Sequence, residues 1–358
     1  MERRAFLQLV AATPLAAATS TAMATGSVPA AGWRRFELTY EVDLSDRKGA
    51  GRLWLPLPQD LGDYQRVLSL TWTGRAGNAG LYWEPEYRAP ILSAAWGEAD
   101  VDRRLAVTAR VATRDRGTHA ASARLCGSEA AALYLKPTEH MPVDGIVAST
   151  AQGIVKGIAS PDARARAIYE WIVDNTFRDP KTRGCGLGNI KFMLETGNLG
   201  GKCADINSLF VGLARAAGIP AREVYGVRVA DSRQFHCLGA SGEVSKAQHC
   251  RAEYFSPRHG WVPVDPADVR KAVLQEKLPL DDPKIVALRA ELFGHWEMNW
   301  VGFNSARDFP LTPAGRGAID YLMYPRAEFA ELVLDGRDPG DFNFRLSSRE
   351  LPAEGQAV

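Results

Sequence analysis

The chain has 358 residues, of which 46% are hydrophobic, so it has enough apolar material for one large or two medium domains with real cores, and a disordered chain is excluded. Its 43 Lys and Arg residues almost balance 42 Asp and Glu residues, which gives a formal net charge of +1. A chain so close to neutral gives no electrostatic reason to expect nucleic acid or anionic lipid as its main partner.

Residues 1–24 are typical of an export signal of the twin-arginine type. Arg3 and Arg4 precede an alanine-rich apolar run, and Ala22-Met23-Ala24 is the small-x-small pattern that a signal peptidase accepts. The acidic residue before the arginine pair leaves the general secretory route open. A proline and scattered Thr and Ser make the run too weakly apolar for a stable membrane span. We therefore expect an exported, periplasmic protein with no membrane span after signal removal.

Residues 30–120 are predicted to form an N-terminal β-domain. Between Phe36 and Leu44, apolar residues alternate with polar ones, which places one face of a strand in a core and the other in water. Three further strand-like runs follow, with Gly and Pro between them, at 52–58, 66–73 and 104–113. This pattern predicts a small antiparallel β-sandwich.

Helical patterning dominates the first part of residues 130–275. Ser160 followed by Pro161 predicts the start of one helix. A second helix is expected to begin at or near Cys203 and to end at Gly218, with apolar residues at helical spacing between them. Strands are expected at 222–229, 248–255 and 260–266. The aromatic-rich residues 276–358 are expected to form a C-terminal extension that packs on this core.

Cys203 lies in the predicted first turn of that second helix, directly after a glycine-rich approach. Unpaired amides at a helix N-terminus stabilise a thiolate, and glycines let backbone amides approach a substrate carbonyl. These features favour a nucleophile. The alternative is a small apolar packing residue, because buried free cysteines are common.

A nucleophilic cysteine needs a base and a group that orients the base. His249 lies on one predicted strand and Asp265 at the end of the next, with a short turn between the two strands. Antiparallel neighbours of this kind bring such side chains within hydrogen-bonding reach. No CxxC pair and no His/Cys cluster at zinc-ligand spacing is present, so we expect neither a metal nor a cofactor.

Three segments carry a family resemblance: GGKCADINSLFVGLARAAGIPAR, HCRAEYF and GWVPVDP. They resemble the core of the transglutaminase-like superfamily, in particular bacterial exported members described as predicted cysteine proteases. The resemblance covers roughly residues 140–270. It implies an α+β fold with a papain-like core, in which the cysteine helix packs on an antiparallel sheet, and it assigns a catalytic triad to Cys203, His249 and Asp265.

The chemistry expected from these residues is thiol-dependent acyl transfer through a thioester intermediate. The leading hypothesis is hydrolysis of an amide or peptide bond in the periplasm, since water is the default acceptor unless the site excludes it. The expected substrate is a protein, a peptide or a peptidoglycan-derived amide. One alternative is transglutaminase-type amide crosslinking, and another is a non-catalytic module that binds peptide or cell-wall polymer.

Arg251 and Trp300 are predicted to bind the substrate. Arg251 stands where many relatives have Trp, and it shares a strand face with His249, so we expect it to meet an acidic group or a carboxy terminus. An ordinary salt bridge to Glu253 or another carboxylate is the alternative. Trp300, in the aromatic-rich C-terminal part, is expected to line the cleft, with packing over the sheet as its alternative.

The sequence holds five cysteines, and an odd number in an oxidising compartment leaves at least one free thiol. If the segments on either side of Glu243 and Val244 pair as a hairpin, Cys237 lies opposite Cys250. We therefore expect a Cys237–Cys250 disulfide, with Cys203 as a free thiol.

Overall fold

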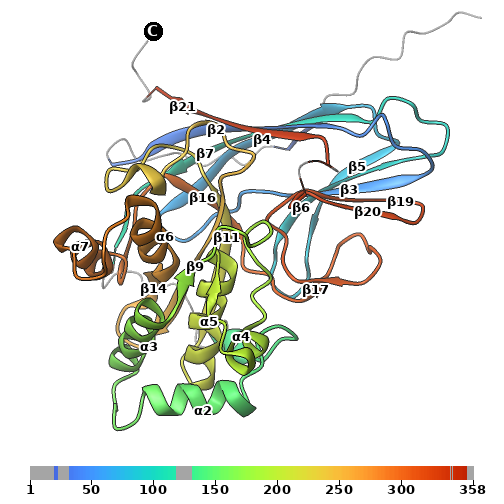
Figure 1. Ribbon diagram of the computed structural model, residues 1–358. Helices are drawn as coiled ribbons and strands as arrows, with labels where there is room; N and C mark the ends of the chain where they lie inside the picture. The colour runs from blue at the N-terminus through green and yellow to red at the C-terminus, as the bar shows by residue number, and fades with distance from the viewer. Residues whose placement is uncertain (1–19, 23–31, 118–130, 339, 341, 353–358) are drawn as a thin grey trace, which may run out of the picture.

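The computed structural model describes residues 20–22, 32–117, 131–338, 340 and 342–352 (Figure 1). Almost all of the expected export signal, residues 1–24, lies outside this range, and so does Cys126. In the part of the chain that is described, no helix combines the length and apolar character needed to cross a bilayer.

The N-terminal part is a sandwich of two antiparallel sheets. In the first sheet the strand order is β1-β4-β7-β2-β21-β12, and in the second it is β20-β19-β3-β6-β5 (Figure 1). Phe36, Leu38, Tyr40 and Val42 are all buried between the sheets, so the predicted alternation is confirmed. The strands are β1 (Ser20–Ala22), β2 (Arg34–Asp43), β3 (Gly51–Pro56), β4 (Gln65–Gly74), β5 (Asn78–Trp83), β6 (Pro90–Trp96), β7 (Arg104–Thr113), β12 (Gly242–Glu243), β19 (Arg326–Phe329), β20 (Leu332–Asp335) and β21 (Phe344–Leu351).

The second part is an α+β unit, as predicted. Its antiparallel sheet has the order β14-β13-β11-β16, and the helices lie together below the sandwich (Figure 1). The helix that starts at Cys203, α5, packs its apolar face on β13 and β11. The elements are α2 (Gly145–Ile154), α3 (Pro161–Asn175), α4 (Ile190–Thr196), α5 (Cys203–Ala216), β11 (Ala221–Arg228), β13 (Gln248–Ser256), β14 (Gly260–Val264), α6 (Pro266–Glu276), α7 (Pro283–Glu291) and β16 (Trp300–Asn304).

Several short elements complete the described fold. The strand pairs β8–β15, β9–β10 and β17–β18 each form a two-stranded sheet. These elements are η2 (Leu133–Leu135), β8 (Arg116–Gly117), β9 (Phe177–Arg178), β10 (Gly200–Gly201), η3 (His236–Leu238), β15 (His295–Trp296), β17 (Phe309–Pro310) and β18 (Ala318–Ile319).

Helix starts follow the capping signals in the sequence. The Ser160 hydroxyl accepts a hydrogen bond from the Ala163 amide, with Pro161 in the first turn of α3. At α5, the Asp205 carboxylate accepts from the Lys202 amide at 3.0 Å, which fixes where the chain turns into the helix. Cys203 is therefore the first residue of α5, as the periodicity predicted.

The C-terminal residues are more dispersed than the sequence indicated. We expected residues 276–358 to pack on the catalytic core, and β16 does join its sheet. The strands β19, β20 and β21 instead complete the two sheets of the sandwich, with β21 paired along its full length with β2. A strand at the edge of a sheet has unpaired backbone groups, which favour pairing with another strand. Here β21, near the end of the chain, is the strand that pairs with β2. The N-terminal sandwich is thus built from both ends of the sequence.

This arrangement makes the last strand part of the folded core. Leu346 on β21 is fully buried opposite Tyr40, so Leu346→Ala is expected to lower the free energy of unfolding by about 2–5 kcal/mol. The neighbouring Arg345 has a 63% exposed side chain, and Arg345→Ala is the matched control, with a change within about 0.5 kcal/mol. Urea unfolding measures both variants, and equal stability of the two would contradict an integral β21.

Candidate active site

The structure brings Cys203, His249 and Asp265 together from three different elements. Cys203 starts α5, His249 is the second residue of β13, and Asp265 precedes the first residue of α6. All three are at most 2% exposed. The His249 Nε2 atom lies 2.7 Å from Asp265 Oδ2, and His249 lies close enough to Cys203 to lower the pKa of its thiol. Because Nε2 is occupied by the carboxylate, Nδ1 is the ring nitrogen left for the thiol.

Strand register explains why His249 and Asp265 meet. In the β13–β14 ladder, Ala252 pairs with Val264, so Asp265 follows one position beyond, across from Arg251. His249 lies two residues from Arg251 on the same strand face. A diagonal pair of this kind is within reach of an imidazole ring and a carboxylate.

Charge favours a thiolate–imidazolium pair. Burial opposes ionisation of Cys203, but its contacts with Cys185, Cys250 and His249 outweigh burial and hold the thiol pKa well below its ordinary value. Burial and Arg228 both lower the pKa of His249, yet the nearby carboxylates of Asp268 and Asp265 raise it overall. The lowered pKa of Cys203 and the raised pKa of His249 are consistent, because the thiolate and the imidazolium stabilise each other.

Two further cysteines flank Cys203. The contact with Cys203, together with burial, raises the pKa of Cys185, and burial and the same kind of contact raise that of Cys250. Both therefore remain thiols, and the Cys250 thiol donates to Glu223 Oε1 at 3.8 Å. Cys185 is held by a bond to the Gln248 carbonyl at 3.3 Å and by the Tyr324 hydroxyl, which donates to its sulfur at 3.1 Å.

The expected Cys237–Cys250 disulfide is wrong. All four cysteines of the described residues are free thiols. Cys250 lies opposite Tyr225 on β11, and Cys237 lies in η3. The assumed hairpin does not form because its central residues, β12, pair with β21 of the sandwich instead of folding back on β13. The sequence shows the strand pattern but not which sheet each strand joins.

Asp265 is fixed by partners that the sequence analysis did not identify. Its Oδ1 atom accepts from Asn207 Nδ2 at 3.3 Å and from the Asp268 amide at 3.1 Å. Asn207 also donates to the Cys250 carbonyl at 2.8 Å, so it ties α5 to β13. Asn207 lies four residues after Cys203, on the same face of α5, so helical periodicity could have identified it as a residue of the site.

A second carboxylate lies beside the first. Asp268 Oδ2 is 3.4 Å from His249 Nε2, and Asp268 Oδ1 pairs with Arg228 at 2.5 Å. Burial raises the pKa of Asp265, and the Asp268 charge adds to this, whereas Arg228 holds the pKa of Asp268 below its ordinary value despite burial. Arg228 and Asp268 are distant in sequence, and no pattern in the chain predicts this pair.

These residues have a spacing that suits a metal ion, but their charges do not. His249, Asp265 and Asp268 offer ligand atoms within 4.8 Å of one another. Arg228 already pairs with Asp268, and the Arg251 Nε atom lies 3.7 Å from Asp265 Oδ2. Two buried guanidinium groups thus neutralise the two carboxylates, and a divalent cation would add uncompensated charge.

Arg251 and Trp300, predicted to bind substrate, have internal roles. Arg251 donates to the Glu297 carbonyl and to Asn299, and its guanidinium lies 5.0 Å from the Trp300 ring centre. The Trp300 indole donates to the His249 carbonyl at 2.9 Å. Both side chains are at most 4% exposed. In the structure these residues hold the strand that carries His249. Their contact with a substrate stays a prediction.

Asp205 supports the loop before α5. Its Oδ1 atom accepts from the Leu187 and Gly188 amides, at 3.1 and 2.9 Å. Gly186 has a φ of +96°, and a Cβ there would collide with this carboxylate, so the close approach requires glycine. A cavity of about 330 Å³ opens beside this loop. Asp205, which follows Cys203 by two positions in the sequence, lines it. Its lining includes Arg183, Leu187, Phe192, Gly200, Asp205 and Arg337.

A cysteine at a helix start, beside a histidine and an aspartate on an antiparallel sheet, defines a papain-like α+β protein. The family model of the transglutaminase-like superfamily core matches residues 148–266. The chain belongs to the transglutaminase-like superfamily. Each of the three residues lies within the matched range.

Two relatives extend the likeness beyond that core. A Haemophilus influenzae protein, described as an "Uncharacterized protein", is 39% identical over 368 residues, which covers 96% of this chain and 100% of the relative. A crystal structure of a "Putative Cysteine Protease" from Cytophaga hutchinsonii superposes with a TM-score of 0.53 at 13% identity, over 90% of this chain and 93% of that one. The latter likeness shows the fold alone.

The pairing of Cys203 with His249 has a measurable signature. In His249→Ala the thiolate loses its cationic partner, so the pKa of Cys203 rises and the alkylation rate at neutral pH falls by about tenfold or more. Iodoacetamide labelling between pH 5 and 10, followed at the peptide that contains Cys203, gives the titration curve. His259→Ala, in the β13–β14 turn, is the control. Identical curves for wild type and His249→Ala would show that the two groups do not interact.

Proposed function

We propose that the protein catalyses thiol-dependent acyl transfer through Cys203, His249 and Asp265, and that its reaction is hydrolysis of an amide or peptide bond. The observation that carries this proposal is the buried series from Cys203 to His249 to Asp265, with charges that favour a thiolate and an imidazolium. A structural cysteine in apolar surroundings has a raised pKa instead.

The first half of the reaction forms a thioester. The Cys203 sulfur attacks the carbonyl carbon, and the Cys203 amide at the start of α5 donates to the developing oxyanion. His249 gives its proton to the leaving amine, which departs as the C–N bond breaks. Asp265 keeps the ring in orientation throughout and stabilises the imidazolium, as the 2.7 Å contact supports.

The second half releases the acid. His249, now neutral, takes a proton from water as the water oxygen attacks the thioester carbonyl. The C–S bond then breaks, and the proton on His249 balances the returning thiolate, so the enzyme recovers its starting charge. A substrate amine in place of water gives crosslinking by the same steps.

The cavity beside the loop before α5 is the proposed substrate cleft. It reaches Gly200 and Asp205 near the cysteine, and its lining combines an exposed aromatic ring, Phe192, with Arg183 and Arg337, which are paired with carboxylates. This mixture suits an extended peptide with apolar and polar groups. We propose a protein, peptide or peptidoglycan-derived amide substrate in the periplasm, where the predicted export signal would deliver the chain.

Loss of the thiol tests the proposal directly. Peptide and peptidoglycan-fragment pools are incubated with the protein and followed by mass spectrometry for new cleavage products. Cys203→Ala is expected to reduce turnover by about 1000-fold or more, with a nearly unchanged melting temperature. Cys237→Ala, a cysteine outside the cluster around Cys203, is the matched control and retains activity. A folded Cys203→Ala variant with full turnover would contradict the proposed catalytic role of the thiol and favour a binding module.

Hydrolysis and crosslinking are separated by the acceptor. In oxygen-18 water, hydrolysis places one heavy oxygen in the new carboxyl group of each cleaved product, with or without an added amine. Crosslinking instead yields a product that carries an added primary amine, such as a fluorescent cadaverine. We expect the heavy oxygen to dominate, because nothing in the proposed cleft, which opens on the surface, excludes water. Predominant amine incorporation would assign the protein to crosslinking.

A further inference from the structure

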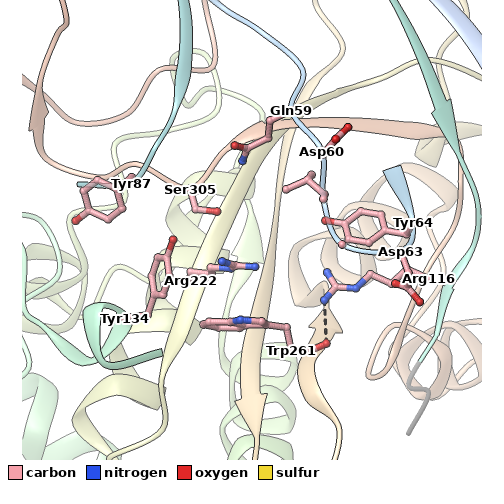
Figure 2. Close-up of a pocket in the computed structure, with 12 residues that line it drawn as sticks. Gln59, Asp60, Asp63, Tyr64, Tyr87, Arg116, Tyr134, Arg222, Trp261 and Ser305 are labelled. Carbon is pink, nitrogen blue, oxygen red and sulfur yellow. Dashed lines mark hydrogen bonds between the residues drawn. The ribbon is translucent and has the colours of Figure 1, made fainter. Parts of the chain in front are cut away.

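A second cavity lies where the sandwich meets the α+β sheet, away from Cys203. Its volume is about 240 Å³, and its walls come from the loop between β3 and β4 on one side and from β11 and β14 on the other (Figure 2). It lies next to Glu253, four residues along β13 from His249, or about 13 Å at strand spacing. The residues that matter for its chemistry are Tyr64, Arg116, Tyr134, Arg222 and Trp261.

The buried charge at this cavity is positive. Glu253 is fully buried and pairs with both Arg116 and Arg222, the latter at 2.9 Å. Two guanidinium groups against one carboxylate leave one cation in surplus. The acids of the β3–β4 loop lie at the rim: Asp60 is exposed, and Asp63 pairs with Arg114. The ion pairs of the described residues therefore leave the inner surplus unmatched.

Two hydrogen-bond donors point into the cavity without a partner. The Arg116 Nη1 atom and the Tyr64 hydroxyl have no hydrogen-bond partner among the described residues, although the two residues are only 9% and 7% exposed. Figure 2 shows the Tyr64 hydroxyl and the guanidinium groups of Arg116 and Arg222 directed toward the space between them. Buried donors are normally satisfied, so an unfilled pair in a cavity points to an acceptor from outside.

The donors are held in place before any ligand arrives. The Arg116 guanidinium lies 4.5 Å from the Tyr64 ring centre and donates from Nη2 to the Trp261 carbonyl at 2.8 Å. The Arg222 guanidinium lies 4.0 Å from the Trp261 ring centre and 5.0 Å from that of Tyr134. Preorganised donors lose little conformational entropy on binding.

We propose that this cavity binds a small organic carboxylate. One carboxylate oxygen accepts from Arg116 Nη1 and the Tyr64 hydroxyl, and the negative charge offsets the surplus cation. Carboxylates suit the planar donor geometry of arginine. The apolar body of the ligand lies against Tyr134 and Trp261. The volume suits a ligand of about the size of a single amino acid or a short-chain acid.

Benzoate is a suitable probe, because benzamide has the same shape without the charge. Titration calorimetry on the full chain is expected to show saturable benzoate binding and at least tenfold weaker benzamide binding. A third measurement tests whether sulfate competes with benzoate for the cavity. Absence of saturable benzoate binding, equal binding of benzamide, or binding of sulfate without benzoate would each overturn the assignment.

Tyr64→Phe locates the site. It removes only a hydroxyl that has no internal partner, so the fold is kept and benzoate affinity falls by about tenfold. Tyr40→Phe is the matched control, since Tyr40 also carries a buried hydroxyl without a hydrogen-bond partner among the described residues but lies inside the sandwich core. Arg116→Lys keeps the charge, loses the Nη1 donor, and is expected to weaken binding similarly. Wild-type affinity for benzoate in both Tyr64→Phe and Arg116→Lys would disprove this site. This outcome is independent of whether the catalytic proposal holds.

Discussion

The carboxylate of Asp265 is the interaction on which the rest of the site depends. It accepts from the first turn of α6 through the Asp268 amide, from α5 through Asn207, and it lies 2.7 Å from the His249 ring on β13. One buried group therefore fixes the relative positions of two helices and a strand. Because the cap of α6 and the partner of His249 are the same carboxylate, folding of the helix and orientation of the imidazole occur together.

Burial of this group imposes a charge balance on its surroundings. Asp265 and Asp268 are matched by Arg251 and Arg228, and all four side chains are almost completely buried. Removal of one member of such a set typically costs about 3–5 kcal/mol, since its partner is left as an uncompensated buried charge. The balance explains why an arginine follows His249 by two positions: it serves the carboxylate, and its stacking on Trp300 holds it there.

The catalytic half is also held by the end of the chain. Arg307 is buried and donates to the carbonyls of Leu187 and Gly188, in the loop that Asp205 binds from the other side. Tyr321 donates to the Gly186 carbonyl at 2.6 Å. The loop before Cys203 is thus fixed by residues more than a hundred positions later, and the strands that follow them close the sandwich. Residues from the C-terminal part of the chain therefore help to shape the loop before Cys203.

The sequence by itself determined part of the elements, namely β2, β3, β4, β7, α3, α5, β11, β13 and β14, and the three residues of the candidate site. Local signals were sufficient there: alternation gave the strands of the sandwich, helical periodicity and the Ser160 cap gave α3 and α5, and two strands joined by a short turn brought His249 to Asp265. Only the tertiary structure decided the partners of β12 and β21, the absence of a Cys237–Cys250 bridge, and the inward roles of Arg251 and Trp300. Strand pairing and buried charge balance join residues far apart in the chain, and spacing along the sequence carries no information about which distant groups meet.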